Sequence, residues 1–308
     1  MPNQTAAKKG KILLITAGAV LVTVFAVFML QATIAEALDE NKCLTCHKDP
    51  NLTKTNKAGV KVSLYVSEQE VNTGAHRYID CTTCHTKDPH KVDTPLTKLS
   101  LAEKCGTCHQ YQYKLHLESI HGQQLVQGNL DVATCVDCHS PDSNPHSVIR
   151  TLEFSAPTYK KNIAQTCAKC HNNERLMASY GIVEKVYESY LRSFHGKAIQ
   201  LGRYQESSLD EATCTNCHGI HDIKIASDPT SPVAGADNLA KTCEQCHPGA
   251  GVEFARGFLG HKESSPENIP AAHYTEIIFS ILLKSVLGFG ALVVVAAIIR
   301  FSVNRWRD

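Results

Sequence analysis

Hydrophobic and polar positions divide the chain into two apolar ends and a long, mixed middle. Ile12–Ile34 and Ile277–Phe301 are almost continuously apolar, and each is long enough to cross a bilayer, which takes about 20 helical residues. In the middle we expect short helices over Lys98–Glu103, Tyr111–Ser119 and Glu184–Ser193. Runs rich in Pro, Ser and Asp separate them and are typical of loops, and no convincing strand pattern is present.

The charges beside the apolar ends predict the orientation of the chain. Lysines precede the first segment and arginines follow the second, and basic residues gather on the cytoplasmic side of a membrane. We therefore expect both termini in the cytoplasm and the roughly 240 residues between the segments on the opposite side. Two alternatives stay open. Ala35–Ala37 resembles the cleavage site of a signal peptide, and a buried helix of a soluble domain is the alternative for the second segment.

All 14 cysteines occur in one motif, C-x-x-C-H, which the chain contains seven times. This motif is typical of covalent haem c attachment, in which the two thiols form thioethers and the histidine is the proximal ligand of the iron. The expected thioether residues are Cys43, Cys46, Cys81, Cys84, Cys105, Cys108, Cys135, Cys138, Cys167, Cys170, Cys214, Cys217, Cys243 and Cys246. The expected proximal ligands are His47, His85, His109, His139, His171, His218 and His247. The sequence thus predicts seven covalently bound haem c groups.

Three other uses of paired cysteines fit the pattern less well. A zinc site has no need of a histidine directly after the second cysteine. A disulfide framework does not require every cysteine to fall into a fixed pair. A redox-active C-x-x-C is normally single and lies in a βαβ unit. Haem attachment accounts for every cysteine and for the histidine that follows each pair.

Nine further histidines lie outside the motifs, and six of them follow an internal repeat. Three units, 76–109, 121–171 and 195–247, share the order lone histidine, motif, lone histidine, motif. The element S-x-H-G and the triplet A-T-C recur in two of these units. Each unit therefore offers two distal iron ligands for its two haems, namely His76, His90, His121, His146, His195 and His221. The first motif lies outside the repeat, and its distal ligand is His116, His261 or His273, with His261 preferred because it lies next to the second apolar segment.

Composition narrows the function further. Lys and Arg number 31 against 30 Asp and Glu, so no basic surface for nucleic acid is expected. Methionine is nearly absent, with three residues in all, so nine histidines for seven vacant positions favour histidine on both sides of every iron. A filled sixth position suits electron transfer. About 34 residues per haem are too few for a conventional core, so the haems themselves are expected to form it.

These observations predict the fold class and the domains. We expect a mainly α fold with extensive loops, in which the haems form the core of a multihaem cytochrome c domain flanked by two transmembrane helices. The expected boundaries are 1–36 for the N-terminal anchor, 37–270 for the extracytoplasmic heptahaem domain and 271–308 for the C-terminal anchor. The expected location is the bacterial inner membrane, with the haem domain on the periplasmic side.

With doubled C-x-x-C-H units and a Gly219-Ile-His221 element after one motif, the chain resembles membrane-anchored multihaem c-type cytochromes. The tail 258–301 is similar to cytochromes that join a membrane cytochrome b, and the first haem motif after an anchor is similar to NapC/NirT-type cytochromes. The resemblance implies a relay that takes electrons from a membrane cytochrome b or another quinol-oxidising subunit. The acceptor would be a soluble or membrane cytochrome in a respiratory chain.

Two other functions stay open. A multihaem reductase or dehydrogenase of a small nitrogen or sulfur compound would need one five-coordinate haem. A direct quinol dehydrogenase would use His273, Glu276 or Lys284 near the membrane for proton transfer. No catalytic residue is assigned, and we expect an electron-transfer subunit rather than an enzyme.

Overall fold

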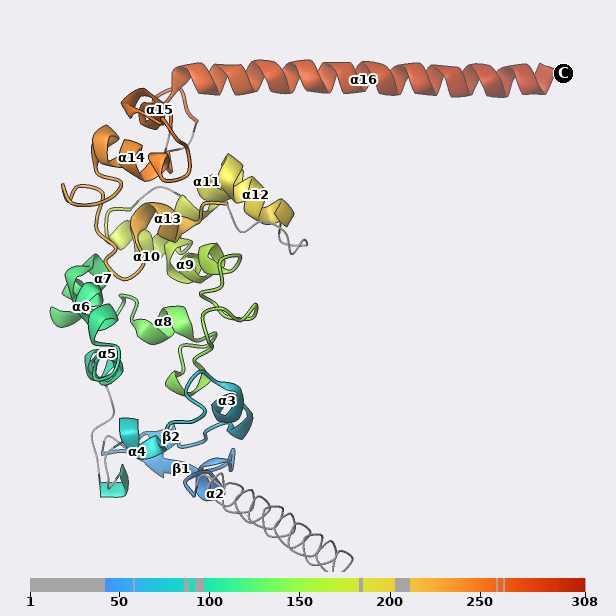
Figure 1. Cartoon of the computed structure of the whole chain (residues 1–308). Coiled ribbons are helices and arrows are strands. Elements are labelled where there is room, and N and C mark those ends of the chain that lie inside the picture. The colour runs from blue at the N-terminus through green and yellow to red at the C-terminus, as the bar shows by residue number, and fades with distance from the viewer. Residues whose placement is uncertain are drawn as a thin grey trace, which may run out of the picture. The chain divides into compact units, whose positions relative to one another are not determined.

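The computed structural model describes residues 42–57, 59–85, 89–91, 97–182, 185–202, 211–258, 260–262 and 264–307. Over these ranges the chain is mainly helical with long loops, which confirms the predicted fold class (Figure 1). The first apolar segment, 12–34, lies outside the described residues. The chain forms two compact units that meet in sequence between Pro95 and Leu96, within the first unit of the predicted repeat.

The N-terminal unit carries the first two motifs on very short helices. Its elements are α2 (Leu44–His47), β1 (Thr53–Thr55), β2 (Lys61–Ser63), α3 (Glu68–Thr73), α4 (Cys81–Cys84) and η1 (Pro89–Lys91). The two strands pair antiparallel, with Thr53 opposite Ser63. The expectation of no strand was therefore wrong. Three-residue strands without a buried face leave no alternating pattern in the sequence.

The C-terminal unit holds the other five motifs. Its elements are α5 (Lys98–Gly106), α6 (Gln110–Glu118), α7 (Ile120–Val126), α8 (Cys135–His139), η2 (Pro145–Ser147), α9 (Ile163–His171), α10 (Glu174–Ser179), α11 (Val186–Arg192), α12 (Phe194–Gly202), α13 (Cys214–His218), α14 (Gly235–Glu244), α15 (Val252–Arg256) and α16 (Pro270–Arg307). The three helices predicted in this region correspond to α5, α6 and α11, with ends that differ by a few residues.

The apolar core of this unit is small. Ala102, Leu125 and Val132 form a buried cluster between α5, α7 and the loop before α8, and Leu99 and Tyr113 pack against it. Most other buried side chains are small or polar. A core of this size fits the expectation that cofactors, rather than side chains, fill the interior of the domain.

The apolar C-terminal segment forms one long helix, α16. Its residues Pro270–Asn304 have the length and composition of a membrane span. The most apolar window of 18 residues has a mean hydropathy of 2.4, and none of this window is buried by the rest of the chain. The helix begins seven residues before the predicted apolar run because Pro270 starts it, and proline fits the first helical position well. The part of the chain that the structure describes therefore carries one exposed helix suited to a membrane anchor.

Candidate functional site: haem attachment motifs and paired imidazoles

Local hydrogen bonds explain why two of the motifs begin a helix at their first cysteine. The amide and the hydroxyl of Thr134 donate to the carboxylate of Asp137 at 2.8 and 2.9 Å. Thr213 makes the same two bonds to Asn216. Both threonines are N-caps, and such a cap fixes where a helix starts. The repeated A-T-C triplet is thus the signal that places the two cysteines and the histidine of each motif on one helical turn.

Cysteines of successive motifs lie near one another. All 14 are free thiols in the structure. Sulfurs of successive motifs approach each other: Cys43 and Cys81 are hydrogen-bonded, as are Cys105 and Cys135, and Cys167 and Cys214. Cys138 also interacts with Cys170, and Cys217 with Cys243. Within each unit, the attachment sites therefore follow one another in chain order.

Five of the proximal histidines face a second imidazole at one nearly constant separation. The ring centroids lie 6.3 Å apart in His47–His90, 6.2 Å apart in His121–His171 and in His139–His221, and 6.1 Å apart in His195–His247 and in His218–His261. An imidazole nitrogen binds a transition metal at about 2.0 Å, so two rings that share one metal ion have centroids roughly 6 Å apart. The five pairs therefore fit an iron held between two histidines.

The pairs correct three assignments made from the sequence, those of His261, His90 and His221. We expected His261 to serve the first motif, but its ring faces His218 of the sixth. We expected His90 to serve its own repeat unit, but it stacks on His47 of the first motif. Distal histidines are interleaved instead: the first lone histidine of a unit pairs with the second motif of that unit, while the second pairs with a motif of the preceding unit, as His221 does with His139. Which distal histidine faces which proximal histidine depends on the packing of helices that are far apart in the chain, and the spacing of residues in the sequence does not reveal it.

A tight helix corner explains the repeated S-x-H-G element. The hydroxyl of Ser119 donates to the carbonyl of His116 and accepts from the amide of Gly122. A Cβ atom on Gly122 would lie 1.9 Å from that same carbonyl oxygen, so only glycine lets α6 and α7 meet there. Ser193 and Gly196 repeat the corner. The histidine between serine and glycine is thereby fixed on the first turn of the second helix, which is how His121 reaches its partner.

Hydrogen bonds to Nδ1 orient several rings for metal binding through Nε2. The Nδ1 of His47 lies 2.8 Å from the carbonyl oxygen of Leu64, which only accepts, so the ring donates there and its Nε2 keeps a free lone pair. The Nδ1 of His261 lies 3.0 Å from the hydroxyl of Ser189. The Nδ1 of His146 lies 3.2 Å from Asn144 Oδ1. Such outer contacts fix the ring plane of a metal ligand and raise its basicity.

Burial keeps the paired imidazoles in the form that binds metal. Desolvation lowers the pKa of His121 to about 4. It also lowers the pKa of five other members of the pairs, namely His139, His171, His195, His218 and His221. Metal binding requires a neutral imidazole, so these rings are poised for it at neutral pH.

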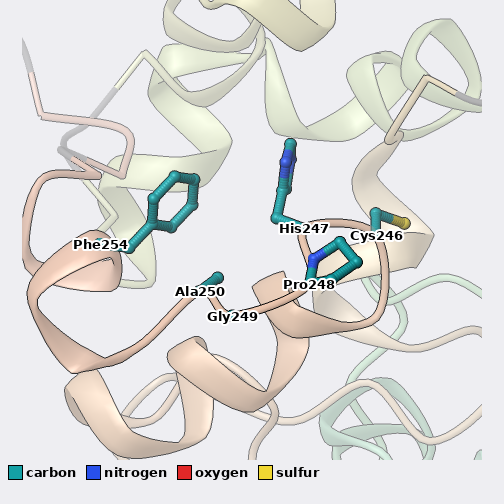
Figure 2. Close-up of a pocket in the computed structure, with 6 residues that line it drawn as sticks. All are labelled: Cys246, His247, Pro248, Gly249, Ala250 and Phe254. Atoms are coloured by element: carbon teal, nitrogen blue, oxygen red, sulfur yellow. The ribbon is translucent and has the colours of Figure 1, made fainter.

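Around His247 the structure contains a pocket of about 350 Å³, lined by Cys246, His247, Pro248, Gly249, Ala250 and Phe254 (Figure 2). The Phe254 ring, from α15, lies 5.4 Å from the imidazole of His247. The pocket offers a sulfur, an imidazole and an apolar wall, which are the groups that a c-type haem contacts. It therefore fits the seventh predicted attachment site.

Sequence reasoning missed a second repeated hydrogen-bond pattern, which lies just before the fifth and seventh motifs. Thr166, just before Cys167, donates to the carbonyl of Pro157, and Thr242, just before Cys243, donates to that of Pro232. Asn162 and Asn238 cap the same loops through side-chain amide bonds to two carbonyls each. The shared N-x-x-x-T-C spacing was the signal that could have revealed it.

Comparisons with known proteins agree with this chemistry. Residues 28–110 match the family model of cytochrome c7 and related cytochrome c, and residues 128–176 match that of the doubled CXXCH motif. Multiheme cytochrome MtrA of Shewanella baltica is 26% identical over 152 residues, which are 48% of this chain and 36% of MtrA. The cytochrome c-type protein TorC of Escherichia coli is 26% identical over 198 residues, 61% of this chain and 44% of TorC.

A third relative is covered more fully. The denitrification system component NirT of Stutzerimonas stutzeri is 24% identical over 182 residues, 56% of this chain and 77% of NirT. By contrast, the chain spans less than half the length of MtrA and of TorC. No solved structure matches the chain. The chain thus contains a cytochrome c7-like region and a doubled CXXCH region, and with its paired imidazoles it is similar to multihaem c-type cytochromes.

Proposed function

We propose that the chain is a non-catalytic heptahaem relay between a quinol-oxidising membrane partner and an extracytoplasmic acceptor. The observation that carries this proposal is the pairing of imidazoles, because a second histidine on an iron leaves no open position for a substrate. Bound haem c would supply reversible one-electron chemistry. The chain's own residues hold both faces of each iron, orient the rings and bury them.

The observed pairs supply distal ligands for five of the seven motifs. His85 and His109 are the proximal ligands of the other two motifs, and His76 and His146 are the candidate distal ligands that remain for them. With these two sites the relay would hold seven haems.

The C-terminal unit suggests where the relay meets the membrane. The helices α8, α9, α13 and α14, which carry motifs four to seven, follow one another toward the start of α16 (Figure 1). His261, the partner of His218, comes only nine residues before Pro270, a distance of at most about 30 Å. Ser264 in this link is tied to α16, because its carbonyl oxygen lies 3.1 Å from the Nδ1 of His273. We therefore place the sixth and seventh sites nearest the membrane surface.

The membrane arrangement follows from the flanking charges and from α16. The helix α16 supports an anchor at the C-terminal end, and the apolar run before the first motif supports a second one. Both termini would be cytoplasmic and the haem domain periplasmic. The anchors suit a complex with a membrane cytochrome b or another quinol-oxidising subunit, and the haem domain suits a soluble or membrane cytochrome as acceptor.

Two measurements on the detergent-solubilised protein test the relay. Electron paramagnetic resonance of the oxidised protein should show only low-spin haem, and the intact mass should equal the polypeptide plus seven haems. A stoichiometric high-spin haem that binds and turns over a small nitrogen or sulfur compound would make the chain an enzyme. Reduction of the haems by quinol with the purified chain alone would favour the direct quinol dehydrogenase.

A further inference from the structure

His116 is a half-buried histidine that the observed ligand pairs do not use. It lies in the last turn of α6, at the corner where α6 meets α7 (Figure 1). Its backbone carbonyl is satisfied by the hydroxyl of Ser119 at 2.6 Å. Its Nε2 atom, in contrast, is buried and has no hydrogen-bond partner. A buried polar atom without a partner costs about 1–3 kcal/mol, so a partner from outside the polypeptide is expected.

The corner between α11 and α12, which repeats the corner between α6 and α7, shows how a side chain at this position can form a hydrogen bond within the chain. Tyr190 occupies the place of His116 there, and its hydroxyl donates to the carbonyl of Ala212 at 3.0 Å. Ala133 corresponds to Ala212 in the segment that follows His116, and the Nε2 of His116 makes no hydrogen bond to its carbonyl. Tyr190 thus makes an internal bond at this position, whereas the Nε2 of His116 makes none.

The neighbours of His116 are two of the paired sites. His116 interacts electrostatically with His221 and with His121. The amide of Ile120 donates to the carbonyl of Ile223 at 2.8 Å, which holds the segment after His221 against this corner. His221 faces His139 of the fourth motif, and His121 faces His171 of the fifth. His116 thus lies at the junction of these two sites.

A haem brings only two kinds of polar group to such a junction, its iron and its two propionates. Both irons at this junction already have two imidazoles each. We propose that Nε2 of His116 donates a hydrogen bond to a haem propionate at the junction of the fourth and fifth sites, and so raises the reduction potential of that haem. The inference rests on the proposed bis-histidine relay. A donor offsets the negative charge of the propionate, which otherwise stabilises the ferric iron.

The test is a potentiometric titration of the full-length protein, of two variants at position 116 and of one control variant at position 190. His116→Phe keeps a ring but removes the donor, and should lower the midpoint potential of one haem while every haem stays low-spin. His116→Gln keeps an N–H donor and should restore the potential at least in part. Tyr190→Phe, which removes the equivalent bond to a backbone carbonyl, should leave all potentials unchanged.

The ring planes show which haem responds. The imidazoles of His139 and His221 are nearly parallel, at 5°, whereas those of His121 and His171 are crossed at 65°. Crossed rings give a more axial low-spin signal than parallel rings, so the magnetic resonance titration separates the two sites. A shift in either signal supports the inference and names the haem.

Three results would overturn the inference. They are unchanged potentials in His116→Phe, a shift that His116→Gln does not reverse, and a new high-spin haem in His116→Phe, which would make His116 an iron ligand. These outcomes leave the relay proposal standing if the wild-type protein is entirely low-spin. A high-spin haem in the wild type would refute the relay, and with it the basis of the inference about His116.

Discussion

Replacing His261 by alanine tests the ligand pairs most directly. The imidazole of His261 faces that of His218 with their centroids 6.1 Å apart, and we expect one iron between them. Removing one ring empties one axial position of one iron and leaves the other four observed pairs intact. The expected result is therefore one high-spin haem among seven, with the other six unchanged.

The local structure predicts that no other histidine replaces the lost ligand. His273 is the next histidine along the chain, but it lies in the first turn of α16 and its Nδ1 is 3.1 Å from the carbonyl oxygen of Ser264. His273→Ala is therefore the matched control, and it should leave every haem low-spin. Spin counting by paramagnetic resonance and the stoichiometry of carbon monoxide binding to the reduced protein measure the effect.

Replacing Ser189 by alanine should weaken the binding of His261 to the iron without abolishing it. Its hydroxyl, 3.0 Å from Nδ1 of His261, is the partner that orients this ring. Loss of such an outer contact typically weakens metal binding by about 10–100-fold, or about 1.4–2.7 kcal/mol. Ser189→Ala should stay low-spin but exchange His261 for added cyanide more readily by that factor. The pairing of His261 with His218 would be refuted if His261→Ala remained fully low-spin, or if His273→Ala produced the same high-spin haem.

Three further changes probe the elements that hold the sites. Gly122→Ala should destabilise the fold by about 3 kcal/mol, because its Cβ would lie 1.9 Å from a carbonyl oxygen, and thermal unfolding measures this. Thr134→Ala should cost about 1 kcal/mol in the same assay through the loss of the N-cap. Burial alone would raise the pKa of Asp137, but hydrogen bonds from Thr134 and the nearby charge of Lys98 lower it. The carboxylate therefore stabilises the fold at pH values above its unfolded pKa, and this stabilisation is lost as the pH falls through the lower pKa of the folded state.

Each of these changes has a control in the chain. Gly251 has no positive φ and nothing within 4 Å of an added Cβ, so Gly251→Ala should leave stability nearly unchanged, and an equal loss in both variants would contradict the steric argument. Asp137→Asn matches the natural Asn216 of the later motif and keeps the cap acceptor. The variant should therefore lose the acid dependence while keeping the helix start, and an unchanged pH profile would argue against the carboxylate.

Some features of this protein were set by local sequence alone. The cysteine and histidine of a C-x-x-C-H motif are covalent neighbours, so the chemistry of haem attachment follows from adjacency and needs no knowledge of the fold. The apolar run that becomes α16 was equally evident, because a span depends on length and hydropathy rather than on contacts. The short helices α5 and α6 also follow from local preference.

The choice of distal ligand was decided only by the tertiary structure. Sequence order assigned His90 to its own repeat unit and His261 to the first motif. In the fold, His90 faces His47 of the first motif and His261 faces His218 of the sixth. Which imidazole faces which depends on how α8, α9 and α13 pack and on the glycine corner that aims His121, and these contacts join residues far apart in the chain. Sequence therefore determines which groups are available to hold iron, while packing determines which two of them meet, because ring-to-ring distance is a property of the folded chain.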